Sequence, residues 1–259
     1  MNIGKFLTKS AQSFPDQIAI VHGDTKFTYA QFNTRTNQLA NSLRRLGVTP
    51  QQHIVVLMHN HPQMLEAIFA CFKLGCGAVP VNFRLHPNEF SYIIDHSEAE
   101  IVITSSEFNE SLRSVLNQLP KVRHFISLSD AEDGWLNYEL LLAESSGDFK
   151  DTDVEPDDVA WLFYTSGTTG QSKGAMLTHR NLVANTLCSA QHLGYTAEQT
   201  TMLSWLPLYH DMGLVGTMLT PLSVGASVVL TPTLGFLRRP VSWIENLSRF
   251  EATATCAPN

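Results

Sequence analysis

Short apolar runs alternate with helix-like segments along most of this 259-residue chain, and this alternation restricts its fold more than any other feature. Ile54–Met58 is a continuous apolar run of the length expected for a strand buried on both faces. The next segment, Leu65–Leu74, has the length and composition of a helix, and Gly75 supplies a stop signal. Because strands that alternate with helices form parallel sheets with helices on their faces, we expect an α/β fold.

The same rhythm predicts further elements on both sides of this pair. Thr28 and Gln31 have the spacing of a capping box at the start of a helix that ends near Gly47. Pro87 suits the first position of a helix that runs to about His96. Further strands are expected at residues 18–21, 77–81, 101–104, 124–128, 159–164, 226–230 and 252–256, and further helices at 112–119, 181–193, 214–222 and 241–250.

Residues 129–157 interrupt this rhythm. They are rich in acidic residues and show weak periodicity, which is typical of a loop or a subdomain boundary. We therefore expect a first α/β subdomain over residues 1–155 and the start of a second over residues 156–259.

Charge and hydropathy argue against several classes of protein. The formal net charge of −7 disfavours nucleic-acid binding, which usually requires a basic surface. No apolar stretch reaches about 18 residues, so no membrane span is expected, and the first residues lack the apolar core of a secretory signal. The four cysteines match no zinc or redox spacing. Cys71 and Cys76 lie in an apolar stretch, as expected of buried free thiols in a reducing cytoplasm, so a cytoplasmic protein is expected.

A loop rich in glycine and hydroxyl residues, Tyr164–Gly174, follows the last residues of a predicted strand. Glycines let backbone N–H groups close around an anion, and hydroxyls add donors to phosphate oxygens or ligands for magnesium. Lys173 adds a mobile positive charge. A flexible surface loop of the same composition is the alternative. A Walker loop does not fit, because Gly167 and Gly170 are too close together and Lys173 is not followed by a hydroxyl residue.

This loop resembles the phosphate-binding signature of the AMP-forming acyl ligases: Tyr or Phe, Thr-Ser-Gly, Ser or Thr, Thr-Gly, any residue, then Pro-Lys-Gly. The superfamily includes acyl-CoA synthetases, fatty acyl-AMP ligases, luciferases and nonribosomal-peptide adenylation domains. Ser172 departs from the pattern, which has proline there. Met176–Leu182 matches the continuation, and Thr178 could cap the following helix. The resemblance covers essentially the whole chain. It implies the large N-terminal domain of an acyl-adenylate ligase, with parallel-rich sheets flanked by helices, incomplete in this chain.

A second match lies in Leu206–Leu214, which contains the pair Tyr209 and His210. In the family an aromatic–histidine pair at this place borders the acyl pocket, so the resemblance implies that His210 is catalytic and lies near the reacting carboxylate. The alternative for an isolated histidine is a hydrogen-bonded core residue. Residues 235–259 resemble the fatty acyl-AMP ligase or long-chain acyl-CoA synthetase branch more than short-chain synthetases.

The resemblance implies ATP-dependent activation of a carboxylic acid, expected to be a fatty acid, to acyl-AMP with release of pyrophosphate. ATP and Mg²⁺ are the implied cofactors, with Thr165 as a possible contact of the metal, and CoA or an acyl carrier protein is the implied acceptor. Family members are much longer and carry further magnesium, ribose and lysine groups, so we expect residues 1–259 alone to be inactive. The residues implied to grip the β- and γ-phosphates are Thr165, Ser166, Gly167, Thr168, Thr169, Gly170 and Lys173.

Two rival functions stay open at this point. One is a fragment of an amino-acid adenylation domain, and the other is a non-catalytic remnant that binds a nucleotide or a protein partner. Two further patterns receive ordinary interpretations. His59 and His61 have the look of a metal pair, but their spacing after a strand is more typical of a turn. Arg238 and Arg239 are interpreted as a solvated surface pair rather than a phosphate site.

Overall fold

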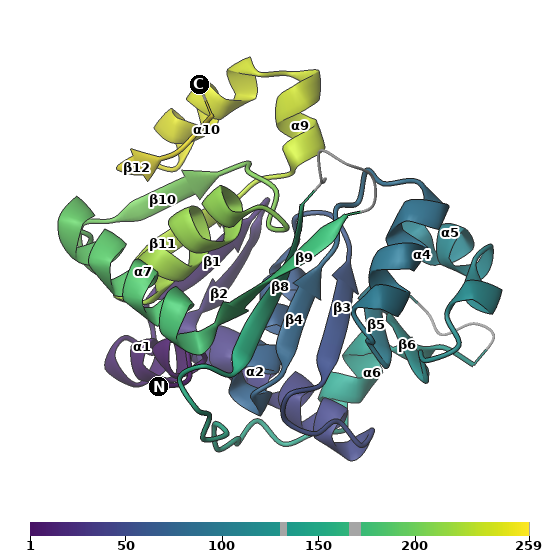
Figure 1. The fold of residues 1–259 in the computed structure, drawn as a ribbon. Coiled ribbons are helices and arrows are strands. Elements are labelled where there is room, and N and C mark those ends of the chain that lie inside the picture. Colours follow the sequence, from purple (N-terminus) through teal and green to yellow (C-terminus); the bar gives the residue numbers. More distant parts are fainter. Residues whose placement is uncertain (130–133, 166–171, 259) are drawn as a thin grey trace.

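The computed structural model describes residues 1–129, 134–165 and 172–258. Its strands form a seven-stranded sheet of order β7-β6-β5-β3-β4-β8-β9 and a five-stranded sheet of order β12-β10-β11-β1-β2 (Figure 1). Most neighbouring strands are parallel, which confirms the expected α/β class with parallel-rich sheets flanked by helices. The strands are β1 (Ile18–His22), β2 (Thr25–Thr28), β3 (His53–Leu57), β4 (Gly77–Pro80), β5 (Ile101–Thr104), β6 (His124–Ser127), β7 (Leu136–Asn137), β8 (Val159–Thr165), β9 (Lys173–Thr178), β10 (Thr201–Ser204), β11 (Ser227–Leu230) and β12 (Ala254–Thr255).

Local sequence signals set several helix ends as predicted. Thr28 and Gln31 form a reciprocal capping box at the start of α2, and Thr178 does the same with Asn181 at the start of α7. Gly75 ends α3 with φ of 73°, a conformation that favours glycine. The α-helices are α1 (Lys5–Ser13), α2 (Tyr29–Arg45), α3 (Pro62–Leu74), α4 (Pro87–His96), α5 (Asn109–Arg113), α6 (Tyr138–Ala143), α7 (His179–Leu193), α8 (Thr220–Leu222), α9 (Thr233–Arg238) and α10 (Val241–Arg249); η1 (Ser106–Phe108) and η2 (Leu116–Gln118) are 3-10 turns, and η3 (Met212–Leu219) is a π-helix.

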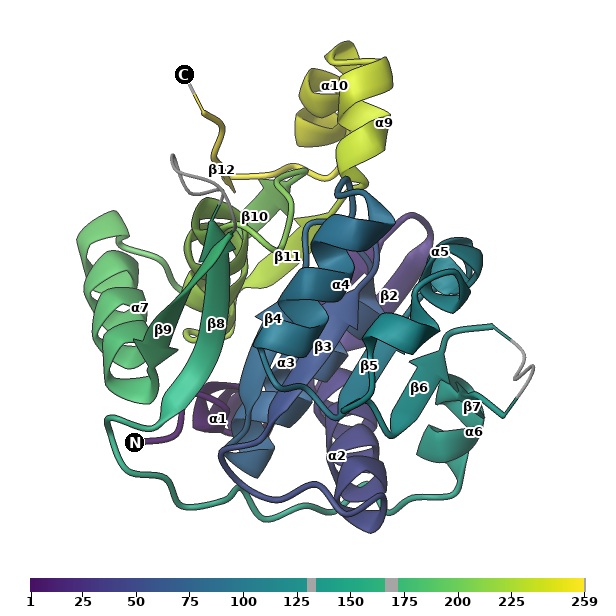
Figure 2. The same cartoon turned by 45° about the vertical axis from the view of Figure 1, so that its right-hand side comes forward.

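The seven-stranded sheet is covered on both faces, which explains its continuous apolar strands. Along β3, Ile54 and Val56 belong to the core that contains α2 and α3, whereas Val55 and Leu57 belong to the core under α4 and α5. Figure 2 shows α4 in front of the strands of this sheet. Side chains alternate along a strand, so every second residue feeds a different apolar layer and the whole run must be apolar.

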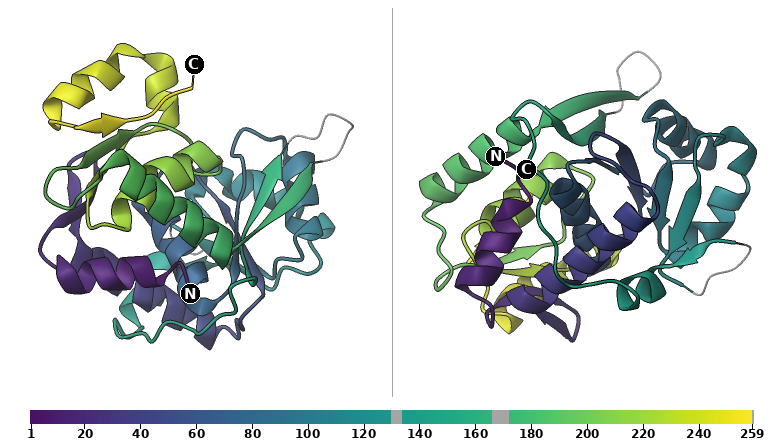
Figure 3. Two further views of the ribbon diagram at one scale, coloured as in Figure 1. Left: turned by 60° about the vertical axis from the view of Figure 1, so that its left-hand side comes forward. Right: turned by 90° about the horizontal axis from the view of Figure 1, so that it is seen from below.

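The five-stranded sheet joins segments that are far apart in the chain. β1 pairs in parallel with β11 and forms an antiparallel hairpin with β2. α10 packs on the face of this sheet away from α1, where Trp243 and Leu247 lie against Val21, Leu203 and Val229 (Figure 3). The expected division at residues 155 and 156 does not separate the sheets, because each sheet contains strands from both sides of it.

Several sequence-based expectations are wrong in detail. The helix expected at residues 112–119 ends at Arg113, and the Ser114 hydroxyl donates to the Ser111 carbonyl (2.7 Å) beside that end. The region 129–157 is not simply a loop, since β7 and α6 lie within it, and Tyr138 and Leu142 are buried in the main core. β9 and β10 were not expected, and the helix expected at 214–222 begins at Met212 as a π-helix.

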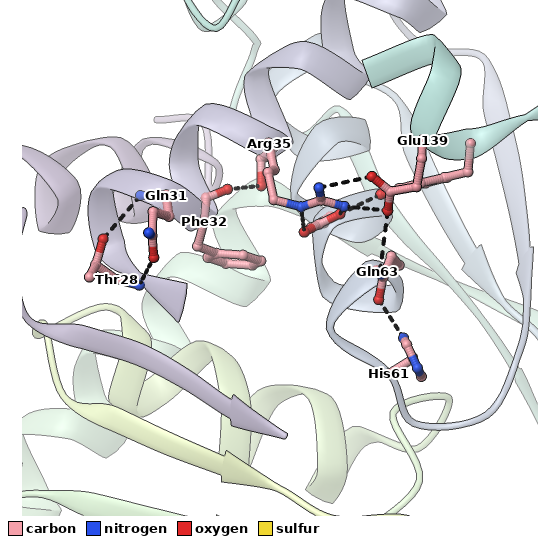
Figure 4. Close-up of polar contacts among 10 residues, drawn as sticks. Thr28, Gln31, Phe32, Arg35, His61, Gln63 and Glu139 are labelled. Atoms are coloured by element: carbon pink, nitrogen blue, oxygen red, sulfur yellow. Dashed lines mark hydrogen bonds and ion pairs between the residues drawn. The ribbon is translucent and has the colours of Figure 1, made fainter. Parts of the chain in front are cut away.

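A buried polar network ties α2, α3 and α6 together (Figure 4). Arg35 forms two bonds with Glu66, of 2.6 and 3.2 Å, and two with Glu139, of 3.0 and 2.7 Å. The Tyr138 hydroxyl donates to Glu66 (2.7 Å), whose side chain is fully buried. The carboxylate of Glu66 is therefore compensated by three donors from two other helices.

The remaining sequence expectations concern membranes and thiols. Among the described residues, none of the helices has the length and hydropathy needed to cross a bilayer. Cys71 and Cys76 are buried free thiols, as expected, and burial raises the pKa of both, to about 12 for Cys76. Cys188, in contrast, is exposed.

Candidate functional site

The glycine-rich segment connects the two strands of an antiparallel hairpin. β8 ends at Thr165 and β9 begins at Lys173, and the register places these two residues directly opposite each other. Thr165 and Lys173 are both exposed. The other predicted phosphate-binding residues, Ser166, Gly167, Thr168, Thr169 and Gly170, lie outside the residues that the structure describes.

The register also fixes which face of the hairpin these residues share. Side chains alternate along a strand, so Thr165 lies on the same face as Phe163. Lys173, directly opposite Thr165, lies on that face too. The Phe163 ring is 6.1 Å from the His210 ring, centroid to centroid, at an interplanar angle of 82°. The structure therefore brings the three described site residues of the sequence analysis, Thr165, Lys173 and His210, to one face of the hairpin.

Tyr164 points from the other face and anchors the hairpin on α4. Its hydroxyl lies 2.7 Å from Nδ1 of His96. Burial, with a smaller contribution from Tyr92, raises the pKa of Tyr164 to about 12, so the hydroxyl stays protonated and can donate to His96. The ring also covers Gly174, where an added Cβ would lie 3.0 Å from Cζ of Tyr164. This close approach explains why glycine follows Lys173.

His210 is held at the rim of the site by its own turn. Its N–H donates to the Pro207 carbonyl (3.1 Å), and its Nδ1 lies 2.7 Å from Oδ1 of Asp211. The Met212 N–H donates to Oδ1 of Asp211 (2.7 Å) and to Nδ1 of His210 (3.4 Å), so the Nδ1 edge of the ring faces its own turn. The side chain is 54% exposed, so the alternative of a core histidine is wrong.

The π-helix η3 packs tightly against the turn that carries His210. An added Cβ on Gly213 would lie 2.2 Å from the Pro207 carbonyl oxygen, so only glycine fits there. Thr217 donates to the Gly213 carbonyl (2.7 Å), which fixes the first turn of the helix. π-Helical turns are rare and occur frequently at functional sites.

A pocket of about 410 Å³ lies between β9, α7 and η3, next to His210. Asp211 lines it and also contacts His210, so the pocket and the histidine are continuous. Its wall is largely apolar, which suits the hydrocarbon part of a ligand. The lining residues are Leu177, Asn181, Leu182, Asn185, Asp211, Met212, Val215 and Gly216.

Two other polar pairs in the sequence were considered as a metal site and as a phosphate site. His59 lies 3.7 Å from Glu107, and His61 bonds to Gln63. The described residues contain no group of three metal-ligating side chains, so the metal interpretation of this pair gains no support. Arg238 and Arg239 are exposed, as expected of a surface pair.

Sequence reasoning missed three residues that shape this region. The sequence did not single out Phe163, which has the features of an ordinary strand residue. It did not single out Asp211 either, which lies inside the motif Leu206–Leu214. Asn60 lies between the two histidines noted above, and its side chain bonds to the segment that leads to His210. Nothing in the local sequence could have revealed a contact across 146 positions.

Known proteins resemble this chain in sequence and in fold. A family model described as AMP-binding enzyme matches residues 7–259. A feruloyl-CoA synthase from Amycolatopsis sp is 33% identical over 235 residues, a match that covers 88% of this chain and 43% of that protein. An indoleacetate–CoA ligase from Aromatoleum aromaticum is 32% identical over 234 residues, which cover 90% of this chain and 45% of the relative.

Among solved structures, the anthranilate CoA ligase AuaEII in complex with anthranoyl-AMP superposes with a TM-score of 0.91 at 26% identity. That match covers 98% of this chain and 49% of the other. The chain thus spans less than half the length of each of these three proteins.

Proposed function

This chain belongs to the AMP-binding enzyme family, and from that premise we propose that it supplies the nucleotide- and acid-binding face of an enzyme that joins a carboxylic acid to AMP. A carboxylate oxygen attacks the α-phosphorus of ATP. The new bond is carboxyl oxygen to phosphorus, and the bond broken joins the α-phosphorus to the oxygen that leaves with pyrophosphate. Such reactions depend mainly on positioning and on neutralising the phosphates.

The hairpin face provides suitable groups for the triphosphate. Lys173 is a mobile cation that can follow the leaving pyrophosphate, and the Thr165 hydroxyl can donate to a phosphate or ligate a metal. Mg²⁺ would neutralise phosphate charge, and it commonly takes few protein ligands beside the phosphates and water. Together with Ser166–Gly170, these residues form the proposed grip on the β- and γ-phosphates.

His210 is proposed to orient the carboxylate. Its ring lies beside Phe163 on the hairpin face, and the adjacent Asp211 lines the apolar pocket, so His210 would lie between the two substrates. Since Asp211 and the Met212 N–H both lie against Nδ1, the ring would present Nε2 to the carboxylate.

The apolar pocket supports a hydrophobic acid as the second substrate. Gly216 leaves open space, since an added Cβ there would meet no atom within 4 Å. We propose a fatty acid, with aromatic acids as the rival class because relatives are named for ferulate and indoleacetate. CoA, which the same names carry, or an acyl carrier protein would accept the acyl group.

Asp211 favours a second candidate, an amino-acid substrate. It places a carboxylate in the pocket wall, and a carboxylate there could pair with a substrate ammonium group. A panel of fatty, aromatic and amino acids, each assayed for acyl-AMP formation by the full-length protein, separates the three classes. Turnover of amino acids alone would reject the fatty-acid proposal.

The observation that carries the proposal is the gathering of Thr165, Lys173 and His210 on one face. Acid-dependent exchange of pyrophosphate into ATP tests it. The full-length protein is expected to catalyse this exchange, and residues 1–259 alone are not. Absence of exchange with every acid class would reject the proposed function, and robust exchange by residues 1–259 would reject only the second expectation.

A further inference from the structure

Asn60 lies just beyond the carboxyl end of β3, and its side chain crosses to the other sheet. The residue is 3% exposed. Its Nδ2 donates to the Leu206 carbonyl (2.8 Å), and its Oδ1 accepts from the Leu208 N–H (3.2 Å). Nδ2 is also 3.4 Å from the Thr231 carbonyl oxygen, just past the end of β11. One amide therefore meets segments that follow both β10 and β11.

This pairing reproduces the hydrogen bonds of a strand neighbour. A side-chain amide carries one acceptor and two donors in one plane, so it can meet a carbonyl and an N–H two residues apart, as a backbone peptide would. β3 belongs to the seven-stranded sheet and β10 to the five-stranded sheet, and the two sheets share no strand among the described residues. Asn60 thus connects the carboxyl ends of the two sheets through its side chain, whereas no backbone strand pairing joins the sheets among the described residues.

The segment that Asn60 holds leads directly into the functional turn. Pro207, between the two bonded residues, accepts the N–H of His210. Tyr209 packs edge-on against Phe83, with ring centroids 5.5 Å apart. Gly213 also lies close to the Pro207 carbonyl, since an added Cβ there would be 2.2 Å from its oxygen. The position of His210 therefore depends on a turn whose beginning is fixed by Asn60.

We propose that Asn60 is a positioning residue, which holds residues 206–208 so that His210 faces the β8–β9 hairpin and the pocket. The inference rests on the proposed adenylation. Aspartate could not replace Asn60, because it lacks a donor and would place a carboxylate against the Leu206 carbonyl oxygen. Alanine would leave that buried carbonyl and the Leu208 N–H without their partner.

The test compares Asn60→Ala with a matched variant, Asn37→Ala, in the full-length protein. Asn37 is also a buried asparagine (6% exposed), and its Nδ2 donates to a distant carbonyl, that of Gly147 (2.8 Å). Both variants are expected to lower the melting temperature. Only Asn60→Ala is expected to lower kcat/KM for the acid, by about tenfold to a hundredfold, because small misplacements of reacting groups have effects of that size. KM for ATP should change by less than about threefold.

A double variant asks whether Asn60 acts through His210. If it does, Asn60→Ala in a His210→Ala background should cost no more than about twofold in kcat/KM, because the histidine that it positions is already gone. An equal loss in both backgrounds would overturn the inference. Asn60→Ser, which replaces the amide with a smaller group that can still donate and accept a hydrogen bond, is used instead of Asn60→Ala if the alanine variant does not fold.

The outcomes separate this inference from the function on which it rests. An inactive wild-type protein would reject the adenylation proposal itself. An active wild-type protein with Asn60 and Asn37 variants of equal activity would reject the positioning role alone.

Discussion

Two clusters of polar side chains in this molecule have opposite relations to water. Arg35, Glu66 and Tyr138 lie between helices, with Glu66 fully buried and its oxygens bonded. Thr165, Lys173 and His210 lie on an open face of the β8–β9 hairpin, and His210 is 54% exposed. A buried cluster must satisfy its members internally, whereas an exposed cluster keeps its members available for a ligand. The first cluster is suited to stability and the second to chemistry.

The electrostatics of the buried cluster support this contrast. Burial raises the pKa of Glu66, while Arg35 and Tyr138 act in the opposite direction. Hydrogen bonds from Arg35 lower the pKa of Glu139, which is half-exposed. Arg35 therefore stabilises two carboxylates, and its removal would leave Glu66 as an unpaired buried acid.

The largest expected effect is on stability, from Arg35→Ala. Breaking a buried ion pair from one side costs about 3–5 kcal/mol, and we expect a loss of that size in the free energy of unfolding, measured by urea denaturation. Arg180→Ala is the control, since Arg180 is 61% exposed and pairs with exposed Asp157. If Arg35→Ala and Arg180→Ala lost the same free energy of unfolding, the buried cluster would have no special role in stability.

The next effect is on activity, from Lys173→Ala. Removing a charged group that stabilises a transition state typically costs about 10²–10³ in rate, and we expect that loss in acid-dependent pyrophosphate exchange by the full-length protein. The melting temperature should stay within about 2 °C, because Lys173 is exposed. Lys26→Ala, another exposed strand lysine, serves as the control and should remain active. If Lys173→Ala greatly lowered the melting temperature but left pyrophosphate exchange unchanged, Lys173 would serve stability and not the reaction.

The third expected effect is a pH dependence of stability that a buried histidine, His179, causes. Burial lowers the pKa of His179 to about 4, and its Nδ1 accepts the Ile3 N–H (3.2 Å). The unfolded chain, with a histidine pKa of about 6.5, binds the proton more readily, so stability should fall as the pH drops from about 6.5 to about 4. His179→Gln should flatten this part of a plot of unfolding free energy against pH. An unchanged slope in the variant would show that other groups cause it.

The smallest expected effect comes from a local contact, the capping box of α7. Thr178→Ala removes the side-chain acceptor of the Asn181 N–H (3.2 Å), and such losses cost about 1 kcal/mol. Thermal unfolding would detect this loss, while pyrophosphate exchange should change by less than about twofold. Thr25→Ala, at the exposed start of β2, is the matched control. A fall in exchange as large as that of Lys173→Ala would mean that the start of α7 belongs to the reactive face.

Much of the fold could be predicted from the sequence because its signals are local. The run Ile54–Met58, the capping boxes at Thr28 and Thr178 and the stop at Gly75 all appear in the structure at or within one residue of their expected places. β9 was missed because it is largely exposed and carries no apolar alternation, and β10 because it has only four residues between irregular segments.

The candidate site, like the fold, could be predicted from the sequence only in part. Composition and resemblance identified the segment after Tyr164 and the histidine at 210, but not which side chains face each other. That information is in the hairpin register, which places Lys173 opposite Thr165. The Arg35 network joins residues 31 and 104 positions apart, and no local pattern encodes such contacts.

The central claim is that the hairpin face serves attack of a carboxylate on the α-phosphate of ATP. The most direct test supplies the full-length protein with ATP, a thiol acceptor and an acid labelled with ¹⁸O in its carboxyl group, and determines the label by mass spectrometry. The account predicts AMP that carries one ¹⁸O atom and pyrophosphate that carries none. ADP with labelled inorganic phosphate, or AMP without the label, would contradict it.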